Sequence, residues 1–394
     1  MIVFAGGDIV LPDRILTSAA LIIEGDRIAA IDTTRRTPPA VAVIDAHESF
    51  IVPGFVDVHV HGVDGHDSLD SAGAIAEIAT RLPRYGVTAF CPTTVACAPD
   101  ALDAVLEQVA RARVSRRSGA ARVLPAHLES NFINPEYNGA QPKACLRLPT
   151  EDRREGNFSG RDILNVVQRR AADVGIVTVA PEIDGVLELI PALVRGGHRV
   201  SLGHSGADYE RSVAAIDAGA RHATHLFNRM TPVTHRAPGL AGAVLSHDAV
   251  TAELICDGFH VHPAMCRLAI AAKRVDGVMA ITDGTAGSGL SPGSLARLGG
   301  RTIRVSDQAA LLEDGTLAGS TLTMDRAFRN IVTMFDRSIP EAAVMCCTTP
   351  ARAMGLAGFG VIAEGNIADL VVLDRAFRVT RTMIGGETVY EKAS

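Results

Sequence analysis

The sequence contains no tryptophan, and aromatic residues make up only 4% of its 394 residues. Proteins that bind single-stranded nucleic acid stack the bases on aromatic side chains, and this chain offers few of them. Its formal net charge is -6, whereas surfaces that bind nucleic acid or anionic membranes carry an excess of positive charge. We therefore expect neither nucleic acid nor a membrane as a partner.

Long apolar runs and paired cysteines are also missing. No run approaches the roughly 18 apolar residues of a membrane-spanning helix, and residues 1–11 lack the basic region and cleavage site of a signal peptide. The cysteines are odd in number, seven, and form no Cys-x-x-Cys pair. This usage is typical of reduced thiols in a protein core, and it predicts a cytoplasmic location.

Strand-like and helix-like segments alternate through most of the chain, which has the 47% hydrophobic content of an ordinary globular protein. The expected strands are the run that ends in His59-Val60-His61 and residues 87–91, 123–128, 176–180, 199–202, 222–226, 252–255 and 277–282. The expected helices include residues 100–112, 160–172, 209–218, 263–273 and 322–337. This alternation predicts an α/β fold with a parallel sheet, closed into a (β/α)8 TIM-like barrel, with an open doubly wound sheet as the alternative.

Short strand-like segments occupy both ends of the chain. At the N-terminus they cover residues 2–4, 20–24, 27–31, 41–45 and 49–52, and at the C-terminus residues 365–374 and 389–390. We predict one small β-sandwich domain formed by residues 1–53 and 356–394, beside a barrel domain of residues 54–355. After a glycine-rich span, 284–300, residues 301–305 and 309–313 predict a hairpin.

Side chains that can bind a metal stand at the ends of several expected strands. His59 and His61 are two residues apart, so a strand presents both on one face. The other members of the set are Glu129, His204, His225 and Asp283. Each of them alone could be an ordinary strand-end residue, but the strands of a parallel barrel bring their carboxyl ends to one rim. Imidazoles with carboxylates suit zinc or iron better than calcium or magnesium, so the set predicts a divalent metal site.

Longer motifs surround these side chains. They read Pro-Gly-Phe-Val-Asp-Val-His-Val-His-Gly at 53–62, Gly-His-Ser at 203–205, Ala-Thr-His-Leu-Phe-Asn at 223–228, His-Arg-Ala-Pro-Gly at 235–239, Asp-Gly-Phe-His-Val-His-Pro at 257–263 and Leu-Ala-Gly-Ser-Thr-Leu-Thr-Met-Asp at 317–325. Together they resemble the amidohydrolase superfamily and, within it, the N-acetylglucosamine-6-phosphate deacetylase family. The resemblance covers nearly the whole chain.

The resemblance implies a metal-dependent deacetylase. Glu129, His204 and His225 correspond to the ligands of the metal that all members share, while His59 and His61 match members that hold a second metal. It implies one or two divalent ions per chain, with zinc as the first expectation and iron, cobalt or manganese as alternatives.

The resemblance also implies the residues that act on the substrate. Asp283 corresponds to the general acid/base of the reaction. The matching substrate contacts are Asn228, Arg236 and His260, the last two near the sugar phosphate, together with Leu317, Ala318 and Gly319 of the sugar pocket. One phosphate contact in such enzymes can come from the neighbouring subunit, which implies a homodimer.

Three places depart from the family pattern. Ser130-Asn131 replaces the usual Gly-Pro, Gln141 replaces a histidine after Gly139-Ala140, and Arg229 replaces a common alanine. We expect these changes on the substrate side, with Ala140, Gln141 and Arg229 among the substrate contacts. The reaction class is therefore clearer than the sugar. N-acetylglucosamine 6-phosphate would yield glucosamine 6-phosphate and acetate, and a different N-acyl amino sugar, such as N-acetylgalactosamine 6-phosphate, is the alternative.

Two other functions compete with this interpretation. Hydrolases of cyclic amides often carry a modified lysine on the fourth strand, but residues 176–182 contain none. A non-catalytic relative tends to lose metal ligands, whereas this chain keeps its histidines and Asp283. Both alternatives are therefore weaker than deacetylation of an amino-sugar phosphate.

Overall fold

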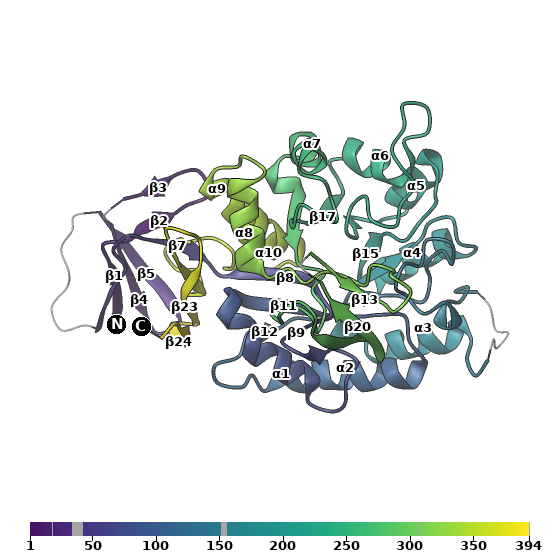
Figure 1. The fold of residues 1–394 in the computed structure, drawn as a ribbon, viewed down its shortest axis with the longest axis horizontal. Coiled ribbons are helices and arrows are strands. Elements are labelled where there is room, and N and C mark those ends of the chain that lie inside the picture. The colour runs from purple at the N-terminus through teal and green to yellow at the C-terminus, as the bar shows by residue number, and fades with distance from the viewer. Residues whose placement is uncertain (18, 34–41, 151–155, 307, 394) are drawn as a thin grey trace.

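Eight parallel strands form the centre of the protein in a computed structural model that describes residues 1–17, 19–33, 42–150, 156–306 and 308–393 (Figure 1). Around the sheet they are β8 (Phe55–Val60), β11 (Val87–Thr94), β13 (Ala126–Glu129), β14 (Val174–Val179), β15 (Arg199–Leu202), β16 (His222–Ala223), β17 (Thr251–Ile255) and β18 (Val278–Ile281). A parallel bridge between Val60 and Gly284 joins the end of this row to its beginning. The predicted barrel is confirmed.

The composition of the strands follows from their burial on both faces. Every residue of β8 and of β14 is buried, and parallel strands covered on both sides are continuous apolar runs. Helices cover the outside of the barrel: α1 (Ala74–Arg81), α2 (Pro99–Val114), α3 (Gly160–Arg169), α4 (Val186–Arg195), α5 (Tyr209–Asp217), α6 (Gly239–Ser246), α7 (Pro263–Lys273), α8 (Met324–Thr333), α9 (Ile339–Ala343) and α10 (Thr349–Ala353). A single large apolar cluster joins their inner faces to the strands.

Four expected elements are shorter or divided in the structure. The strand expected at 222–226 ends at Ala223, because the backbone enters the left-handed region at His225, where φ is 29°. Residues 123–128 form two strands, β12 (Arg122–Val123) and β13, since Pro125 between them has no N–H to donate to a ladder. The helices expected at 160–172 and 322–337 are confined to α3 and α8.

The two chain ends meet in a pair of packed sheets (Figure 1). One sheet contains β5 (Arg27–Asp32), β4 (Ala20–Glu24), β1 (Ile2–Ala5) and β6 (Ala42–Asp45), and the other contains β24 (Glu387–Glu391), β23 (Val379–Ile384), β22 (Leu370–Asp374), β7 (Ser49–Pro53), β2 (Asp8–Val10) and β3 (Ile15–Leu16). Apolar side chains of both sheets form one cluster. The β-sandwich built from both termini is confirmed, whereas the domain boundaries stay a prediction and Val41 lies outside the described residues.

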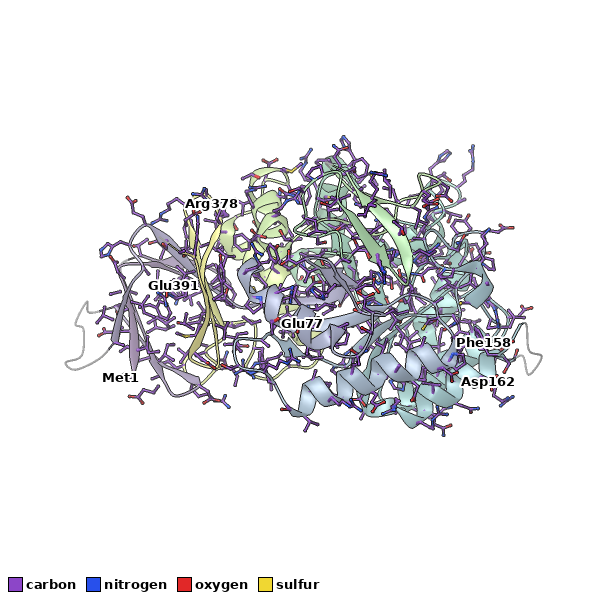
Figure 2. All side chains as sticks on the ribbon, turned by 60° about the horizontal axis from the view of Figure 1, so that its bottom comes forward. Met1, Glu77, Phe158, Asp162, Arg378 and Glu391 are labelled. Carbon is purple, nitrogen blue, oxygen red and sulfur yellow. The ribbon has the colours of Figure 1, made fainter. Side chains whose placement is uncertain are left out.

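A bidentate ion pair connects the sandwich to the barrel. Arg122 Nε and Nη2 donate to the two carboxylate oxygens of Asp369 at 3.0 and 3.1 Å, and Asp369 is buried. The molecule is elongated: Met1 and Glu391 mark the sandwich, and Phe158 and Asp162 mark the opposite end (Figure 2). The ion pair between Arg122 and Asp369 therefore holds the sandwich against one end of the barrel.

A small antiparallel sheet follows the glycine-rich span. It contains β19 (Leu295–Leu298), β20 (Arg301–Val305) and β21 (Ala310–Leu311). The expected hairpin is present, and β19 is a third strand that the sequence did not indicate. Leu298 and Ile303 of this sheet pack against Val95 and Ala318 near the mouth of the barrel. Nearer the first strand, β9 (Gly62–Val63) and β10 (His66–Asp67) form a short ribbon.

The cysteines are in the unpaired, mostly buried state that the composition suggested. All seven cysteines are unpaired thiols, and six of them are buried. Within the described ranges of the chain, no helix has the length and apolar character needed to cross a membrane.

Acid is expected to destabilise the barrel through His222, a buried residue of β16. Burial, and then the positive charge of Arg199, lower the pKa of His222 from 6.5 to about 4. The unfolded chain therefore takes up this proton at a higher pH than the folded one does. We expect the free energy of unfolding to fall, by up to roughly 3 kcal/mol, as the pH drops from the pKa of His222 in the unfolded chain toward its pKa in the folded chain. Above both pKa values, His222 should not affect the stability.

Urea unfolding of the metal-free protein at about pH 7 and about pH 5 measures this effect. The variant His222→Gln should lose less stability between the two conditions than the wild type does. His235→Gln, a substitution at an exposed histidine, serves as the matched control and should behave as the wild type. Equal losses in His222→Gln and wild type would contradict the prediction.

Candidate metal centre

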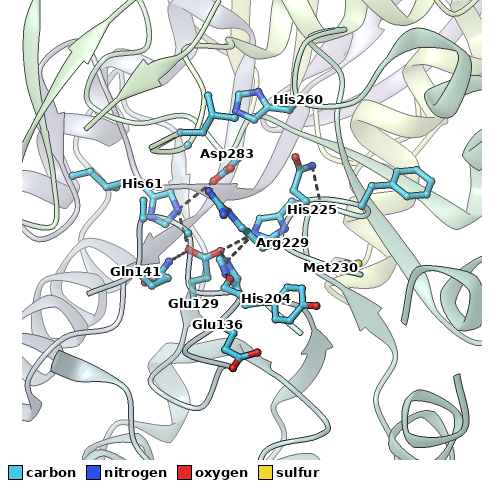
Figure 3. Close-up of a pocket in the computed structure, with 18 residues that line it drawn as sticks. His61, Glu129, Glu136, Gln141, His204, His225, Arg229, Met230, His260 and Asp283 are labelled. Atoms are coloured by element: carbon cyan, nitrogen blue, oxygen red, sulfur yellow. Dashed lines mark hydrogen bonds and ion pairs between the residues drawn. The ribbon is translucent and has the colours of Figure 1, made fainter. Parts of the chain in front are cut away.

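The structure brings all six predicted metal and acid/base side chains to one mouth of the barrel. Figure 3 shows them with the exception of His59. Two come from the end of β8 and one from the end of β13, while the others follow β15, β16 and β18 directly. Their exposed fractions range from 0 to 7%. The complete set is His59, His61, Glu129, His204, His225 and Asp283.

An unusual backbone conformation aims three of these side chains into the mouth. His204, His225 and Asp283 have φ values of 48°, 29° and 48°, in the left-handed region that non-glycine residues enter at a cost of about 1–3 kcal/mol each. Each residue lies where the chain turns after a barrel strand. Gly319 lies beside this turn, because a Cβ there would be 2.8 Å from the backbone oxygen of Asp283.

Glu129 is shared by two groups of ligand atoms. Its Oε1 is 2.7 Å from His204 Nε2 and 2.9 Å from His225 Nε2. Its Oε2 is 3.5 Å from His61 Nε2, on the other side of the carboxylate. A carboxylate in this position can contribute one oxygen to each of two adjacent cations.

His59 completes the second group, and Asp283 lies against it. His59 Nε2 lies 3.3 Å from His61 Nε2, and Asp283 Oδ1 lies 3.2 and 3.3 Å from the same two nitrogens. Ligand atoms bound tetrahedrally to one zinc ion at 2.0–2.2 Å are separated by about 3.3 Å. The chemistry of both groups therefore suits divalent metal ions, and the spacing around His59 and His61 also matches that of zinc ligands.

The histidines keep both carboxylates ionised. Burial alone would raise the pKa of Glu129, but His204 and His225 hold it well below its ordinary value. Burial likewise would raise the pKa of Asp283, and the charges of His59 and His61 lower it instead. Both groups are therefore carboxylates at neutral pH, as a metal ligand and a proton acceptor need to be.

The chain was compared with known families, proteins and structures. The amidohydrolase family model matches residues 50–389. The chain belongs to the amidohydrolase family. An N-acetylglucosamine-6-phosphate deacetylase of Bacillus subtilis (strain 168) is 33% identical to this amidohydrolase, over 97% of this chain and 95% of the relative. An N-acetylgalactosamine-6-phosphate deacetylase of Escherichia coli O157:H7 is 34% identical, over 91% of this chain and 92% of the relative.

A solved structure has the same fold as this amidohydrolase over nearly its full length. It is the N-acetyl-D-glucosamine-6-phosphate deacetylase of Mycobacterium smegmatis, a mutant in complex with N-acetyl-D-glucosamine-6-phosphate. Its TM-score is 0.88 at 32% identity, and the alignment covers 98% of this chain and 99% of that one. The fold and family inferred from the sequence are thus confirmed.

A cavity of about 400 Å³ opens above the candidate metal ligands of the amidohydrolase. Of the predicted substrate contacts, its walls include Ala140, Gln141, Asn228, Arg229, His260, Leu317 and Gly319. Ala318 does not line the cavity, because it is fully buried in the apolar cluster beneath β19–β21. Arg236 is exposed on the loop before α6 and is also absent from the cavity wall.

One of the three departures lies elsewhere than expected. Ser130 Oγ donates to the backbone oxygen of Thr178 at 2.5 Å, and Asn131 Nδ2 donates to the backbone oxygens of Cys97 and Cys145 at 2.8 and 2.7 Å. Both side chains are buried and absent from the cavity wall. The expectation that Ser130-Asn131 faces the substrate was wrong, because these side chains satisfy buried backbone groups instead.

The other two departures do face the cavity. Gln141 donates from Nε2 to Glu129 Oε2 and accepts the backbone N–H of Ala96 at 2.7 Å, so it contacts a candidate metal ligand directly. Arg229 crosses Gly139, where a Cβ would lie 2.7 Å from the arginine Nε. Arg229 therefore depends on glycine at position 139, where φ is 57°.

His260 offers a buried nitrogen to the cavity. Asp257 Oδ2 lies 2.5 Å from His260 Nδ1, and His260 Nε2 is buried without a hydrogen-bond partner among the described residues. Burial would lower the pKa of His260, but the carboxylate of Asp257 raises it above its ordinary value. A protonated His260 donates from Nε2, which suits an anionic group in the cavity.

Several residues of the site were not predicted from the sequence. Glu253 hydrogen-bonds His59, and the backbone oxygen of Tyr137 accepts from His204 Nδ1 at 2.8 Å. A lone carboxylate inside the apolar strand β17 was a usable signal for Glu253. Tyr137 contributes its backbone oxygen, a contact that the residue type does not indicate. The further cavity residues that the sequence did not indicate are Glu136, Phe227, Met230 and Leu298.

Removing the shared carboxylate should disturb both metal positions. We expect Glu129→Gln to lose metal from both groups, because a neutral amide is a much weaker ligand than a carboxylate. His204→Asn should affect its own group more strongly than the one at β8. Elemental analysis after dialysis measures the metal content, and a variant Glu129→Gln with the full wild-type content would refute the shared role.

Proposed function

We propose that this amidohydrolase removes the N-acetyl group of an amino-sugar 6-phosphate. With N-acetylglucosamine 6-phosphate, water adds to the acetyl carbon, the carbon–nitrogen bond breaks, and glucosamine 6-phosphate and acetate leave. The substrate follows from what the similar proteins from Bacillus subtilis and Mycobacterium smegmatis are named for.

One observation in the structure carries the proposal: the same cavity holds groups for both parts of such a substrate. His61, Glu129, His204, His225 and Asp283 line it on one side, and His260 offers its unpartnered nitrogen to the same space. The first set suits hydrolysis of an amide, and the second suits an anion. An amino-sugar phosphate has both features in one small molecule.

The metal is proposed as zinc, with iron, cobalt or manganese as alternatives, because two or more imidazoles accompany a carboxylate in each group. Glu129, His204 and His225 would hold one ion, and His59, His61 and Glu129 a second. When bound there, a divalent ion lowers the pKa of water and polarises the acetyl oxygen.

Asp283 is proposed as the general acid/base. It is ionised, lines the cavity, and lies next to His59 and His61. As a base it accepts a proton from the attacking water. It then delivers that proton to the departing nitrogen, because expulsion of an unprotonated amide anion is prohibitively unfavourable.

The phosphate contacts are proposed to come from two subunits. His260 and Arg229 of one chain face the cavity, and Asn228 lies beside Arg229. Arg236, exposed outside this cavity, would reach the phosphate of the neighbouring subunit in a homodimer. Its planar guanidinium suits a phosphate group. Six buried, unpaired thiols suit a reducing compartment, so the reaction is assigned to the cytoplasm.

The galactosamine epimer is the second candidate substrate. The Escherichia coli relative named for it is 34% identical to this chain, no further away than the one from Bacillus subtilis, at 33%. Arg229 and Gln141 alter the cavity wall where a sugar would lie. Acetate release from each of the two phosphorylated sugars therefore decides which one is the substrate.

Acetate release from N-acetylglucosamine 6-phosphate, N-acetylgalactosamine 6-phosphate and the two sugars without phosphate tests the function. We expect turnover of at least one phosphorylated sugar. Asp283→Asn should keep its metal content but lose roughly 10²–10⁴-fold in kcat, because the amide cannot accept the proton. Absence of acetate release from all four compounds, with metal present, would reject the proposal.

Replacing Arg229 should weaken binding of the phosphorylated substrate in particular. The loss of a charge-assisted hydrogen bond costs about 1.5–3 kcal/mol, so Arg229→Met should raise KM for the phosphorylated sugar by roughly 10–100-fold. KM for the sugar without phosphate should change little. Arg378→Met, on the exposed sandwich surface, is the control. Equal effects on both sugars would show that Arg229 does not read the phosphate.

A further inference from the structure

A buried carboxylate lies beneath the candidate metal centre. Glu253 stands in the middle of β17 with an exposed fraction of 0%. Its strand neighbours Ala252 and Leu254 are apolar and equally buried. A carboxylate in such surroundings costs several kcal/mol unless it is well paired, so its partners are informative.

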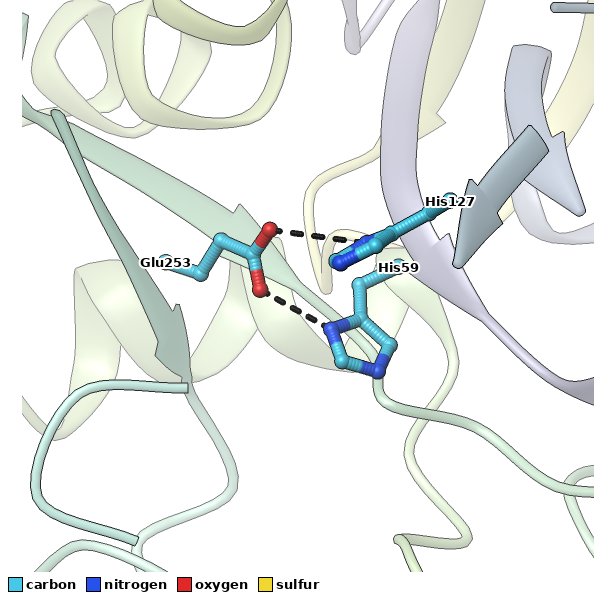
Figure 4. Close-up of side chains that lie close together, drawn as sticks. All are labelled: His59, His127 and Glu253. Carbon is cyan, nitrogen blue, oxygen red and sulfur yellow. Dashed lines mark hydrogen bonds and ion pairs between the residues drawn. The ribbon is translucent and has the colours of Figure 1, made fainter. Parts of the chain in front are cut away.

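The partners of Glu253 belong to both metal groups. Oε2 of Glu253 accepts a hydrogen bond from His59 Nδ1 at 2.9 Å and one from the backbone N–H of His225 at 3.3 Å. Figure 4 shows the carboxylate reaching from β17 toward His59 and His127. A single side chain thus connects the ring of one metal ligand to the backbone of another.

The bond to His59 determines which nitrogen of that ring is free. When Nδ1 carries the proton and donates to Glu253, the lone pair lies on Nε2. Nε2 is the atom that lies 3.3 Å from His61 Nε2 and 3.2 Å from Asp283 Oδ1. Metal-binding histidines commonly donate their other N–H to a carboxylate, which fixes the ring orientation and makes the ligand more basic.

The same three residues could instead be read as a metal site of their own, since ligand atoms of His59, His127 and Glu253 lie within 4.8 Å of one another. His127 argues against it. Its Nδ1 lies 3.0 Å from the backbone oxygen of Val58, and its Nε2 lies 2.8 Å from Thr178 Oγ1. A neutral imidazole that donates at one nitrogen and accepts at the other has no lone pair left for a metal.

We propose that Glu253 is a positioning residue for the metal centre. It keeps His59 in the tautomer that presents Nε2, and it ties that ring to the backbone of His225. The position formed by His59 and His61 can therefore hold its ion, while the position formed by His204 and His225 depends on Glu253 much less. This inference rests on the metal binding in the proposed function and not on the identity of the sugar.

Metal content and affinity of the variant Glu253→Gln test the role. Glutamine keeps the size of the side chain but removes the charge and can turn an NH₂ group toward His59, which favours the wrong tautomer. We expect the affinity for the second ion to fall by about 10–100-fold, so that dialysed protein keeps one zinc ion per chain where the wild type keeps two.

A matched control separates this role from general loss of a buried carboxylate. Asp369 is also buried and doubly bonded, to Arg122, but it lies at the junction with the sandwich. Asp369→Asn should lower thermal stability and leave the metal content unchanged. Equal metal loss in Asp369→Asn and Glu253→Gln would overturn the inference.

Two further variants keep the test decisive if Glu253→Gln folds poorly. Glu253→Asp keeps the charge but withdraws it from His59, so it should bind the second ion with intermediate affinity. His59→Asn should lose the second ion by itself, and adding Glu253→Gln to it should cause no further metal loss. Wild-type affinity in Glu253→Asp, or additive losses in the double variant, would contradict the role.

The outcome is distinguishable from failure of the proposed function. A wild-type protein that holds one ion and still releases acetate would overturn this inference and leave the deacetylase intact. A protein that releases no acetate but loses one ion in Glu253→Gln would support the inference and reject the substrate.

Discussion

The hydrogen bond from the backbone N–H of Asp283 to the backbone oxygen of His59, 2.9 Å long, closes the barrel at its functional end. It brings the start of the barrel against its eighth strand, residues more than half the chain apart. Only with this closure can Asp283 face the nitrogens of His59 and His61. In an open sheet the first and last strands would lie at opposite edges, and the six metal-competent side chains would not share one mouth.

Closure of the barrel buries several ionisable side chains close together at its mouth, which costs desolvation free energy. The neighbouring side chains offset part of this cost. The acidic groups at the mouth are bordered by imidazoles that keep them ionised. The left-handed backbone at His204, His225 and Asp283 adds strain that the surrounding packing has to hold. A cation at the centre of each ligand group would offset much of the cost of burying the carboxylates. Metal binding would therefore stabilise the folded protein as well as equip it for hydrolysis.

The sequence was a reliable guide to whatever depends on local pattern and strand order. The alternation of strands and helices predicted the barrel, and the positions of His59, Glu129 and His204 at strand ends predicted that they would converge. It was a poor guide to side-chain direction in loops. Ser130 and Asn131 follow Glu129 in the sequence, yet they bond to buried backbone groups. Strand β19 was missed because a glycine-rich sequence suppresses the strand signal.

Gln141 lines the cavity and also hydrogen-bonds Glu129 beneath it. It donates to Glu129, which is central to both metal groups, and it accepts the N–H of Ala96 from the loop after β11. A glutamine has one acceptor oxygen and a donor NH₂ group, so it can make these two contacts at once. Gln141 therefore connects Glu129 to the loop after β11. A change at Gln141 is therefore also a change in the surroundings of Glu129.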